Sequence, residues 1–291
     1  MNREARAECA RLCLDPPPRR GQDRDRSCLE APINRGECSM AVLQDKVALI
    51  TGGESGIGLA TARLFIAEGA RVHLVGADEP KLASAVEELG EDDALASVAD
   101  VTNEAAVIRA VAEGGDRFGR LDIVVSNAGI SGEVSEIVDY PSDVFARTLE
   151  VHVLGAFHML KHTIPRISDG GSIIITSSVV GLIGFGGLSA YVAAKHGQVG
   201  LMRSAAKELA PRRIRVNTIH PGPTSTAFQD DIEMRATGQP RDEAAKVFDA
   251  LVPLGRHTTP EEIAQGMLYL AADQSAMVTS HTFSIDGGLS G

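Results

Sequence analysis

The sequence predicts an α/β fold in which a single doubly wound parallel sheet carries helices on both faces. Short apolar runs alternate with amphipathic stretches from Lys46 onward, and the alternation continues almost to the end of the 291-residue chain. No internal repeat or low-complexity segment interrupts it after residue 40. Strands that are separated by helices are typical of βαβ units, which assemble into parallel sheets.

Short apolar runs mark the expected strands. They lie at 47–50, 71–75, 95–98, 121–125, 172–176, 214–219 and 282–285. Valine and isoleucine are frequent in them, as is typical of strands that are buried on both faces.

Amphipathic stretches between these runs mark the expected helices. They lie at 58–68, 80–89, 103–118, 141–164 and 191–209, and a last helix begins at Thr259. Pro80 suits the first turn of its helix, and Pro211 ends the helix before it. The longest stretch without an expected strand runs from 221 to 259.

Composition divides the chain at about residue 40. All four cysteines, Cys9, Cys13, Cys28 and Cys38, precede that point, and their spacing matches no common zinc pattern, so no metal site is expected. Residues 1–39 are therefore expected to be a disordered or upstream-extended tail that activity does not require, with Met40 as the natural start. The predicted catalytic domain is 40–291.

Charge and hydropathy exclude several classes of protein. A net charge of -11 argues against nucleic-acid binding through a basic surface. The chain has no apolar run long enough for a membrane span and no secretory signal at its start. These observations predict a cytoplasmic protein with no nucleic-acid or membrane partner.

A glycine turn follows the first expected strand. It reads Thr51-Gly52-Gly53-Glu54-Ser55-Gly56-Ile57-Gly58 and leads into a helix. Glycines allow the backbone to approach phosphates, and the helix N-terminus offers free N–H groups. The turn therefore predicts a pyrophosphate site, although a tight strand-to-helix turn would also need glycines.

A serine, a tyrosine and a lysine are expected to meet at the carboxyl edge of the sheet. Tyr191 and Lys195 are four residues apart at the start of a helix and share one of its faces. Ser178 follows the end of an expected strand. An ammonium group near a phenol favours the phenolate, so we expect Lys195 to lower the pKa of Tyr191.

With these motifs in this order, residues 44–287 resemble the short-chain dehydrogenase/reductase family. The resemblance implies a Rossmann-type sheet and a catalytic set of Ser178, Tyr191 and Lys195. Tyr191 would be the general acid/base, Lys195 would lower its pKa and bind the ribose, and Ser178 would bind the substrate oxygen. The cofactor-binding residues that the resemblance implies, besides Tyr191 and Lys195, are Gly52, Ser55, Gly56, Ile57, Gly58, Asp100, Val101, Asn127, Ala128, Gly129, Pro221, Gly222, Thr224 and Thr226.

The chain departs from the family pattern in two places. Ser126 replaces the first Asn of the family's NNAG element, and His152 stands where the family has an Asn that relays protons. An imidazole can donate and accept a proton, so His152 is a candidate relay. The alternative is a core histidine that only satisfies a helix carbonyl.

The cofactor is expected to be NAD rather than NADP. The family's NAD-type acid and NADP-type arginine fall at Gly76 and Ala77, and Ser55 holds a position that is often basic in NADP enzymes. Asp78 could reach the ribose and would repel a 2′-phosphate, although it could equally cap the next helix. The absence of a cation favours NAD.

The resemblance implies an oxidoreductase that interconverts a secondary alcohol and a ketone by hydride transfer. Apolar residues after Ser178, with Phe228, Ile232 and Met234, suggest a hydrophobic or alicyclic substrate. Asp230, Asp231 and Glu233 argue against an anionic substrate, unless they only form the solvated face of a lid helix. The alternatives are a β-ketoacyl (acyl-carrier-protein) reductase, for which Arg203, Lys207, Arg212 and Arg213 would dock the carrier, and a non-catalytic dinucleotide sensor or scaffold.

A homotetramer is expected through apolar helix faces, with Val153, Phe157, Leu160, Val192, Val199, Met202, Met267, Leu268 and Leu270 as candidates.

Overall fold

A seven-stranded parallel sheet forms the centre of the protein. The structure, a computed structural model, describes residues 41–291; the tail and its four cysteines lie outside the described residues. The strands are β1 (Val47–Thr51), β2 (Arg71–Gly76), β3 (Ala94–Val98), β4 (Leu121–Ser126), β5 (Ile167–Thr176), β6 (Arg215–Pro221) and β7 (Thr282–Ile285). Their order, β3-β2-β1-β4-β5-β6-β7, confirms the expected doubly wound sheet.

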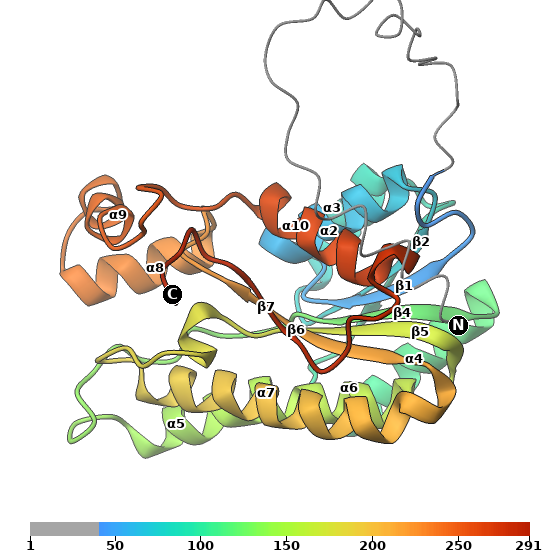
Figure 1. Ribbon diagram of the computed structural model, residues 1–291, viewed down its shortest axis with the longest axis horizontal. Coiled ribbons are helices and arrows are strands. Elements are labelled where there is room, and N and C mark those ends of the chain that lie inside the picture. Colours follow the sequence, from blue (N-terminus) through green and yellow to red (C-terminus); the bar gives the residue numbers. More distant parts are fainter. Residues whose placement is uncertain (1–40) are drawn as a thin grey trace, which may run out of the picture. The chain divides into compact units, whose positions relative to one another are not determined.

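Helices cover both faces of this sheet (Figure 1). One face carries α2 (Gly56–Ala67), α3 (Glu79–Leu89) and α10 (Pro260–Ala271). The other carries α4 (Glu104–Phe118), α6 (Gly155–Thr163) and α7 (Ser189–Leu209). Short 3-10 turns lie at Val179–Gly181, Ala210–Arg212 and Asp273–Ser275.

The hydrophobic core is divided by the sheet into two layers. Alternate residues of one strand point into different layers: Ala48 and Ile50 pack with α2 and α10, while Leu49 packs with α4 and α6. This burial on both sides explains why the strands read as continuous apolar runs. The order of the strands reverses between β1 and β4, and ligands bind at such a switch point, outside the carboxyl ends of the strands.

The helix expected at 141–164 is interrupted, so that prediction was wrong in its middle. The chain forms α5 (Ser142–Leu149), a π-helical turn (Glu150–Leu154) and then α6. The backbone N–H of Gly155 donates to the carbonyl of Glu150, five residues back, instead of four. This wide turn carries His152, which is buried.

Two helices lie in the long stretch after β6 for which no strand was expected. They are α8 (Ala227–Thr237) and α9 (Arg241–Asp249), and they stand beside the sheet in Figure 1. Thr226 caps α8, since its hydroxyl accepts from the N–H of Gln229. Strand β5 is also longer than expected, because it begins at Ile167 and includes Gly170 and Gly171.

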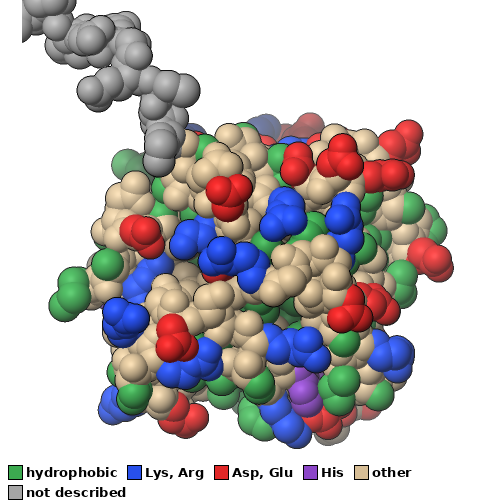
Figure 2. Space-filling view, turned by 90° about the vertical axis from the view of Figure 1, so that its right-hand side faces the viewer, with side chains coloured by type: hydrophobic (Ala, Val, Ile, Leu, Met, Phe, Trp, Pro, Cys, Tyr) green, Lys and Arg blue, Asp and Glu red, His purple; other side chains and the backbone are tan. Residues whose placement is uncertain are grey.

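Figure 2 shows the side of the molecule opposite α8 and α9, where charged groups of both signs are mixed and hydrophobic side chains are scattered among them. Within residues 41–291, no helix has both the length and the apolar character needed to cross a membrane.

Candidate active site

A cavity of about 390 Å³ opens at the carboxyl ends of the strands. It is lined by the glycine turn after β1, the ends of β2, β4, β5 and β6, the start of α7 and the start of α8. The sequence-predicted residues that line it are Gly52, Ser55, Gly56, Ile57, Asp100, Val101, Asn127, Ala128, Gly129, His152, Ser178, Tyr191, Lys195, Pro221, Gly222, Thr224 and Thr226. Two predicted residues, Gly58 and Asp78, are not among the lining residues.

The glycine turn is fixed against the end of β4. The hydroxyl of Thr51 accepts from the backbone N–H groups of Asn127 (2.8 Å) and Ala128 (3.0 Å), and the Asn127 amide donates to the carbonyl of Gly52. Gly52 and Gly56 have φ angles of 63° and 50°, which favour glycine. A Cβ at Gly58 would overlap the carbonyl group of Gly52 and lie 2.9 Å from the Asn127 amide.

Lys195 is buried beneath Tyr191, one helical turn away on α7. Its Nζ donates to the carbonyl of Thr176 at 2.7 Å and lies 5.2 Å from the centre of the Tyr191 ring. Burial lowers the pKa of Lys195 to about 7, because it disfavours the charged form.

The expected direction of the Tyr191 pKa shift was wrong for this structure. Burial raises the pKa of Tyr191 above its ordinary value, and hydrogen bonding to Ser178 only partly opposes that shift. Lys195 does not reverse the effect, since its ammonium group is directed to the Thr176 carbonyl. The neutral phenol is therefore the form that this environment favours.

His220 positions the Ser178 segment, a role that no motif in the sequence indicates. Its Nδ1 lies 2.6 Å from the carbonyl oxygen of Ser178, and its Nε2 lies 2.8 Å from the hydroxyl of Thr218. The neighbouring Ser177 hydroxyl donates to the carbonyl of Lys195. The ends of β5 and β6 and the start of α7 are thus connected directly behind the candidate catalytic groups.

His152 reaches the cavity from the π-helical turn. Its Nε2 lies 2.8 Å from the carbonyl oxygen of Ile130, and its ring centre is 5.3 Å from that of Tyr191. Its Nδ1 is buried and has no hydrogen-bond partner among residues 41–291. Burial and the nearby Lys195 hold the pKa of His152 well below its usual range, so the ring is neutral.

The two aspartates that were expected at the adenosine end have different surroundings. Asp78 caps α3 by accepting from the N–H of Lys81, and it also pairs with the Lys81 ammonium at 2.7 Å, outside the cavity. Of the two possibilities expected for Asp78, contact with the ribose or capping of the next helix, the structure has the cap. Asp100 lines the cavity, where it pairs with Arg147 at 2.8 Å and accepts from the N–H of Thr102.

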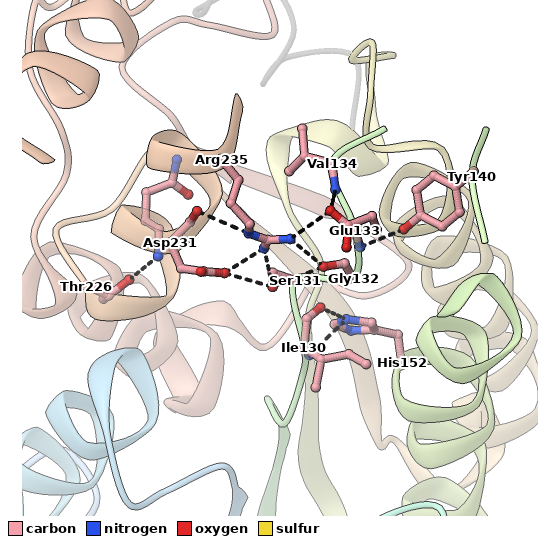
Figure 3. Close-up of polar contacts among 11 residues, drawn as sticks. Ile130, Ser131, Gly132, Glu133, Val134, Tyr140, His152, Thr226, Asp231 and Arg235 are labelled. Carbon is pink, nitrogen blue, oxygen red and sulfur yellow. Dashed lines mark hydrogen bonds and ion pairs between the residues drawn. The ribbon is translucent and has the colours of Figure 1, made fainter. Parts of the chain in front are cut away.

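Arg235 connects α8 to the loop after β4 (Figure 3). Its guanidinium donates to the carbonyl of Gly132 and the hydroxyl of Ser131, both at 2.8 Å, and pairs with Asp231. The same loop is held by Tyr140, whose hydroxyl accepts from the N–H of Glu133. These contacts fix the position of α8 over the side of the cavity where Tyr191 lies.

His257 lies between two carboxylates and joins α8 to α9. Its Nε2 is 2.6 Å from the carboxylate of Glu233, which is 1% exposed, and its Nδ1 is 2.7 Å from Asp249. Burial acts to lower the pKa of His257, but the hydrogen bonds to Asp249 and Glu233 outweigh it and the pKa is raised. The stabilisation that charged His257 provides is therefore complete below about pH 6.5 and is lost as the pH rises through the raised pKa.

His257→Gln is expected to lower Tm by about 5 °C at pH 6 and by less than half of that at pH 9, because the neutral amide replaces a charged group only at the lower pH. Thermal melting at the two pH values measures this difference. His196→Gln, at an exposed position without a carboxylate partner in the described chain, is the control. An equal loss of Tm at both pH values would contradict the charged state of His257.

Several lining residues were not predicted from the sequence. Those with polar or charged side chains include Glu54, Arg147, Thr176 and Gln229. Glu54 lies inside the glycine turn, so the motif itself could have pointed to it. The others come from helices and strand ends where only the folded chain brings them to the cavity.

A family model described as Enoyl-(Acyl carrier protein) reductase matches residues 52–290. The chain is 37% identical, over 253 residues, to trans-4-hydroxycyclohexanecarboxylate dehydrogenase of Sinomonas cyclohexanicum, covering 84% of this chain and 92% of the relative. The chain belongs to the short-chain dehydrogenase/reductase family.

Two further similarities agree with this membership. The 3-oxoacyl-[acyl-carrier-protein] reductase FabG of Thermotoga maritima is 37% identical over 253 residues, covering 85% of this chain and 98% of the relative. A crystal structure of NAD+-bound xylitol dehydrogenase is 34% identical with a TM-score of 0.80, covering 84% of this chain and 99% of that one. This short-chain dehydrogenase/reductase is an oxidoreductase that acts on CH–OH groups, as its sequence predicts.

Proposed function

We propose that the chain interconverts an alicyclic secondary alcohol and its ketone, with NAD as the hydride carrier. The observation that carries the proposal is that Ser178, Tyr191 and Lys195 line the same cavity as the glycine turn. A cofactor bound on the turn and a substrate bound at Tyr191 would then meet in one enclosed space.

The residues of the cavity fit a nicotinamide dinucleotide. The N–H groups of the glycine turn would hold the pyrophosphate, Asp100 and Val101 the adenine, and Lys195 the ribose next to the nicotinamide. Pro221, Gly222, Thr224 and Thr226 border the nicotinamide end. The buried Thr176 Oγ1 and His152 Nδ1 have no hydrogen-bond partner in the described chain, so each can form a hydrogen bond with a ligand or a water molecule. The nicotinamide supplies the hydride chemistry, and the chain supplies position and proton transfer.

Tyr191 is the general acid/base in this proposal. During reduction its neutral phenol donates a proton to the ketone oxygen, while the Ser178 hydroxyl binds the same oxygen. During oxidation the proton moves in the opposite direction. Lys195 stabilises the phenolate that remains, and its lowered pKa allows it to exchange a proton near neutral pH.

His152 is a positioning residue and a proton relay in the same proposal. If Nε2 donates to the Ile130 carbonyl, the buried Nδ1 is left as an acceptor that has no partner in the described chain. Such an acceptor can hold a water molecule between solvent and Lys195, as the family's Asn would.

The surroundings of Tyr191 favour an apolar substrate. Its ring belongs to a hydrophobic cluster with Val179, Val180, Leu188 and Ile232. The α8 acids are paired, Asp230 with Arg241 and Asp231 with Arg235, so they are no barrier to a substrate that carries a carboxylate. The relative that is named for a hydroxylated cyclohexane carboxylate supports an alicyclic ring.

An acyl-carrier-protein substrate is less well supported by the charges near the cavity. Arg203 is 12 residues beyond Tyr191 on α7, roughly 18 Å along the helix axis. Arg212 and Arg213 follow the end of α7, at the opposite edge of the sheet, and Arg212 is bound to Asp169. An acidic carrier would therefore meet the basic run far from the catalytic groups.

A panel of substrates tests this proposal. Cyclohexanol, 4-hydroxycyclohexanecarboxylate and a β-ketoacyl thioester are assayed with each cofactor by the near-ultraviolet absorbance of reduced nicotinamide. Turnover of the cyclic alcohols supports the proposal, and turnover of the thioester alone would favour the acyl reductase. No turnover with intact cofactor binding would indicate a dinucleotide sensor.

NAD is expected to give a kcat/KM at least about tenfold higher than NADP, because binding a 2′-phosphate needs an Arg or Lys to offset its desolvation. The cavity-lining cations are Arg147, which is paired with Asp100, and Lys195 below Tyr191. Initial rates with both cofactors measure the ratio. A preference for NADP would show that another cation reaches the phosphate.

A homotetramer is expected from exposed apolar side chains on the helices. Among the interface candidates, Leu160, Val199, Met202, Met267 and Leu270 instead pack in the core, because those helices turn that face to the sheet. Phe157 remains 44% exposed, next to Leu154, and Tyr269 is exposed on α10. Light scattering at micromolar concentration measures the mass, and a monomer would contradict the expectation.

A further inference from the structure

The strand-end acid of NAD-binding folds is missing at its usual place, and a glutamate from the glycine turn fills the space. Strand β2 ends at Gly76, followed by Ala77, and both line the cavity. A Cβ on Gly76 would lie 2.6 Å from Cδ and 2.7 Å from Oε1 of Glu54. The carboxylate of Glu54 thus lies where a side chain at position 76 would begin, and any residue other than glycine at 76 would require this carboxylate to move.

Glu54 has an acceptor that the described chain does not use. Its Oε2 is buried and has no hydrogen-bond partner among residues 41–291. Burial raises the pKa of Glu54, and the charge of Asp78 adds to this effect. Lys81 does not neutralise Glu54 directly, because its ammonium pairs with Asp78. A buried carboxylate oxygen without a donor costs free energy, so a site of this kind is suited to a ligand that brings hydroxyl donors.

We propose that the Glu54 carboxylate accepts hydrogen bonds from the adenosine ribose hydroxyls of the dinucleotide and thereby selects NAD over NADP. The inference rests on the proposed function, since it assumes that the cavity binds a nicotinamide dinucleotide. Dinucleotide folds place an acid after the second strand for the ribose 2′-hydroxyl. Here the carboxylate comes from the turn after β1, and Gly76 leaves the space that it occupies.

The same contact explains rejection of a 2′-phosphate. A phosphate dianion at this position would lie against the Glu54 carboxylate, and the two cations of the described chain nearest this end are already paired, Arg147 with Asp100 and Lys81 with Asp78. The specificity that Asp78 was expected to supply therefore comes from Glu54.

Fluorescence titration with NADH and NADPH tests the inference by binding alone. For Glu54→Gln, the Kd of NADH is expected to rise about tenfold and the Kd of NADPH to fall, because the charge is removed while the size is kept. Glu79→Gln, which removes a charge from the neighbouring exposed helix turn, is the matched control and should change neither Kd. Urea unfolding verifies that both variants are folded.

The outcomes distinguish a failure of the proposed function from a failure of the role of Glu54. If the wild type binds neither NADH nor NADPH, the proposed function itself is wrong. If the wild type binds NADH but Glu54→Gln keeps the original ratio of the two Kd values, the role of Glu54 is overturned and nicotinamide binding stands.

A position swap provides an independent test. Gly76→Asp alone is expected to weaken NADH binding, because its Cβ overlaps the Glu54 carboxylate. Combining it with Glu54→Gly should restore NADH binding and the preference over NADPH, since the acid then stands at the strand end. A double variant that binds NADH no better than Glu54→Gln would overturn the proposal.

Discussion

Tyr191→Phe is expected to lower kcat by about 10²–10⁴-fold while leaving the Kd of NADH essentially unchanged. Phenylalanine keeps the ring that packs against His152 and Phe228 but removes the only hydroxyl that the proposal uses for proton transfer. Steady-state rates and fluorescence titration of the same preparation measure both quantities.

Tyr269→Phe is the matched control for this experiment. Tyr269 is an exposed residue of α10 and does not line the cavity, so its variant should keep the wild-type rate. Turnover of Tyr191→Phe within about tenfold of the wild type would be too fast for the loss of a general acid/base group.

Gly58→Ala is expected to abolish measurable cofactor binding and to lower the free energy of unfolding by about 1–3 kcal/mol. The added Cβ would overlap the backbone of Gly52, which cannot move without disturbing the bonds of Thr51 and Asn127. Urea unfolding and NADH titration measure the two effects.

Gly200→Ala provides the contrast, because it makes the same substitution at an exposed position within α7 where a Cβ meets nothing within 4 Å. This variant should be more stable than the wild type by up to about 1 kcal/mol, owing to the higher helix propensity of alanine. If both variants bind NADH normally, the close packing of the glycine turn is not required for the cofactor site.

Central strands such as β1 and β4 could be predicted because they are buried on both faces, which leaves a continuous apolar run in the sequence. The first half of β5 was missed because Asp169, Gly170 and Gly171 have the composition of a turn, and the β4–β5 pairing is irregular there. The bounds of helices α8 and α9 were not predicted for a different reason. Their polar sequences bury few side chains, and ion pairs such as that of His257 with Glu233 hold them in place.

The site was predictable where a local backbone geometry requires a particular residue. It was not predictable where residues distant in sequence come into contact. The glycine turn and the Tyr191–Lys195 spacing are local and could be read along the chain. The contact of Glu54 with Gly76 joins positions 22 residues apart in sequence, and it depends on how β1 and β2 pair. The Tyr191 pKa was expected to fall because sequence spacing indicates a nearby charge but not the depth of burial.

The π-helical turn at Glu150–Leu154 also acts as a phase shift between two helices. One extra residue within the turn rotates α6 by roughly 100° relative to the continuation of α5. The shift lets Arg147 face the cavity while Met159 and Leu160 face the core. Deleting one residue from this turn would remove the rotation, so Arg147 could not face the cavity while Met159 and Leu160 face the core. The length of this segment is therefore constrained even where its individual side chains are not.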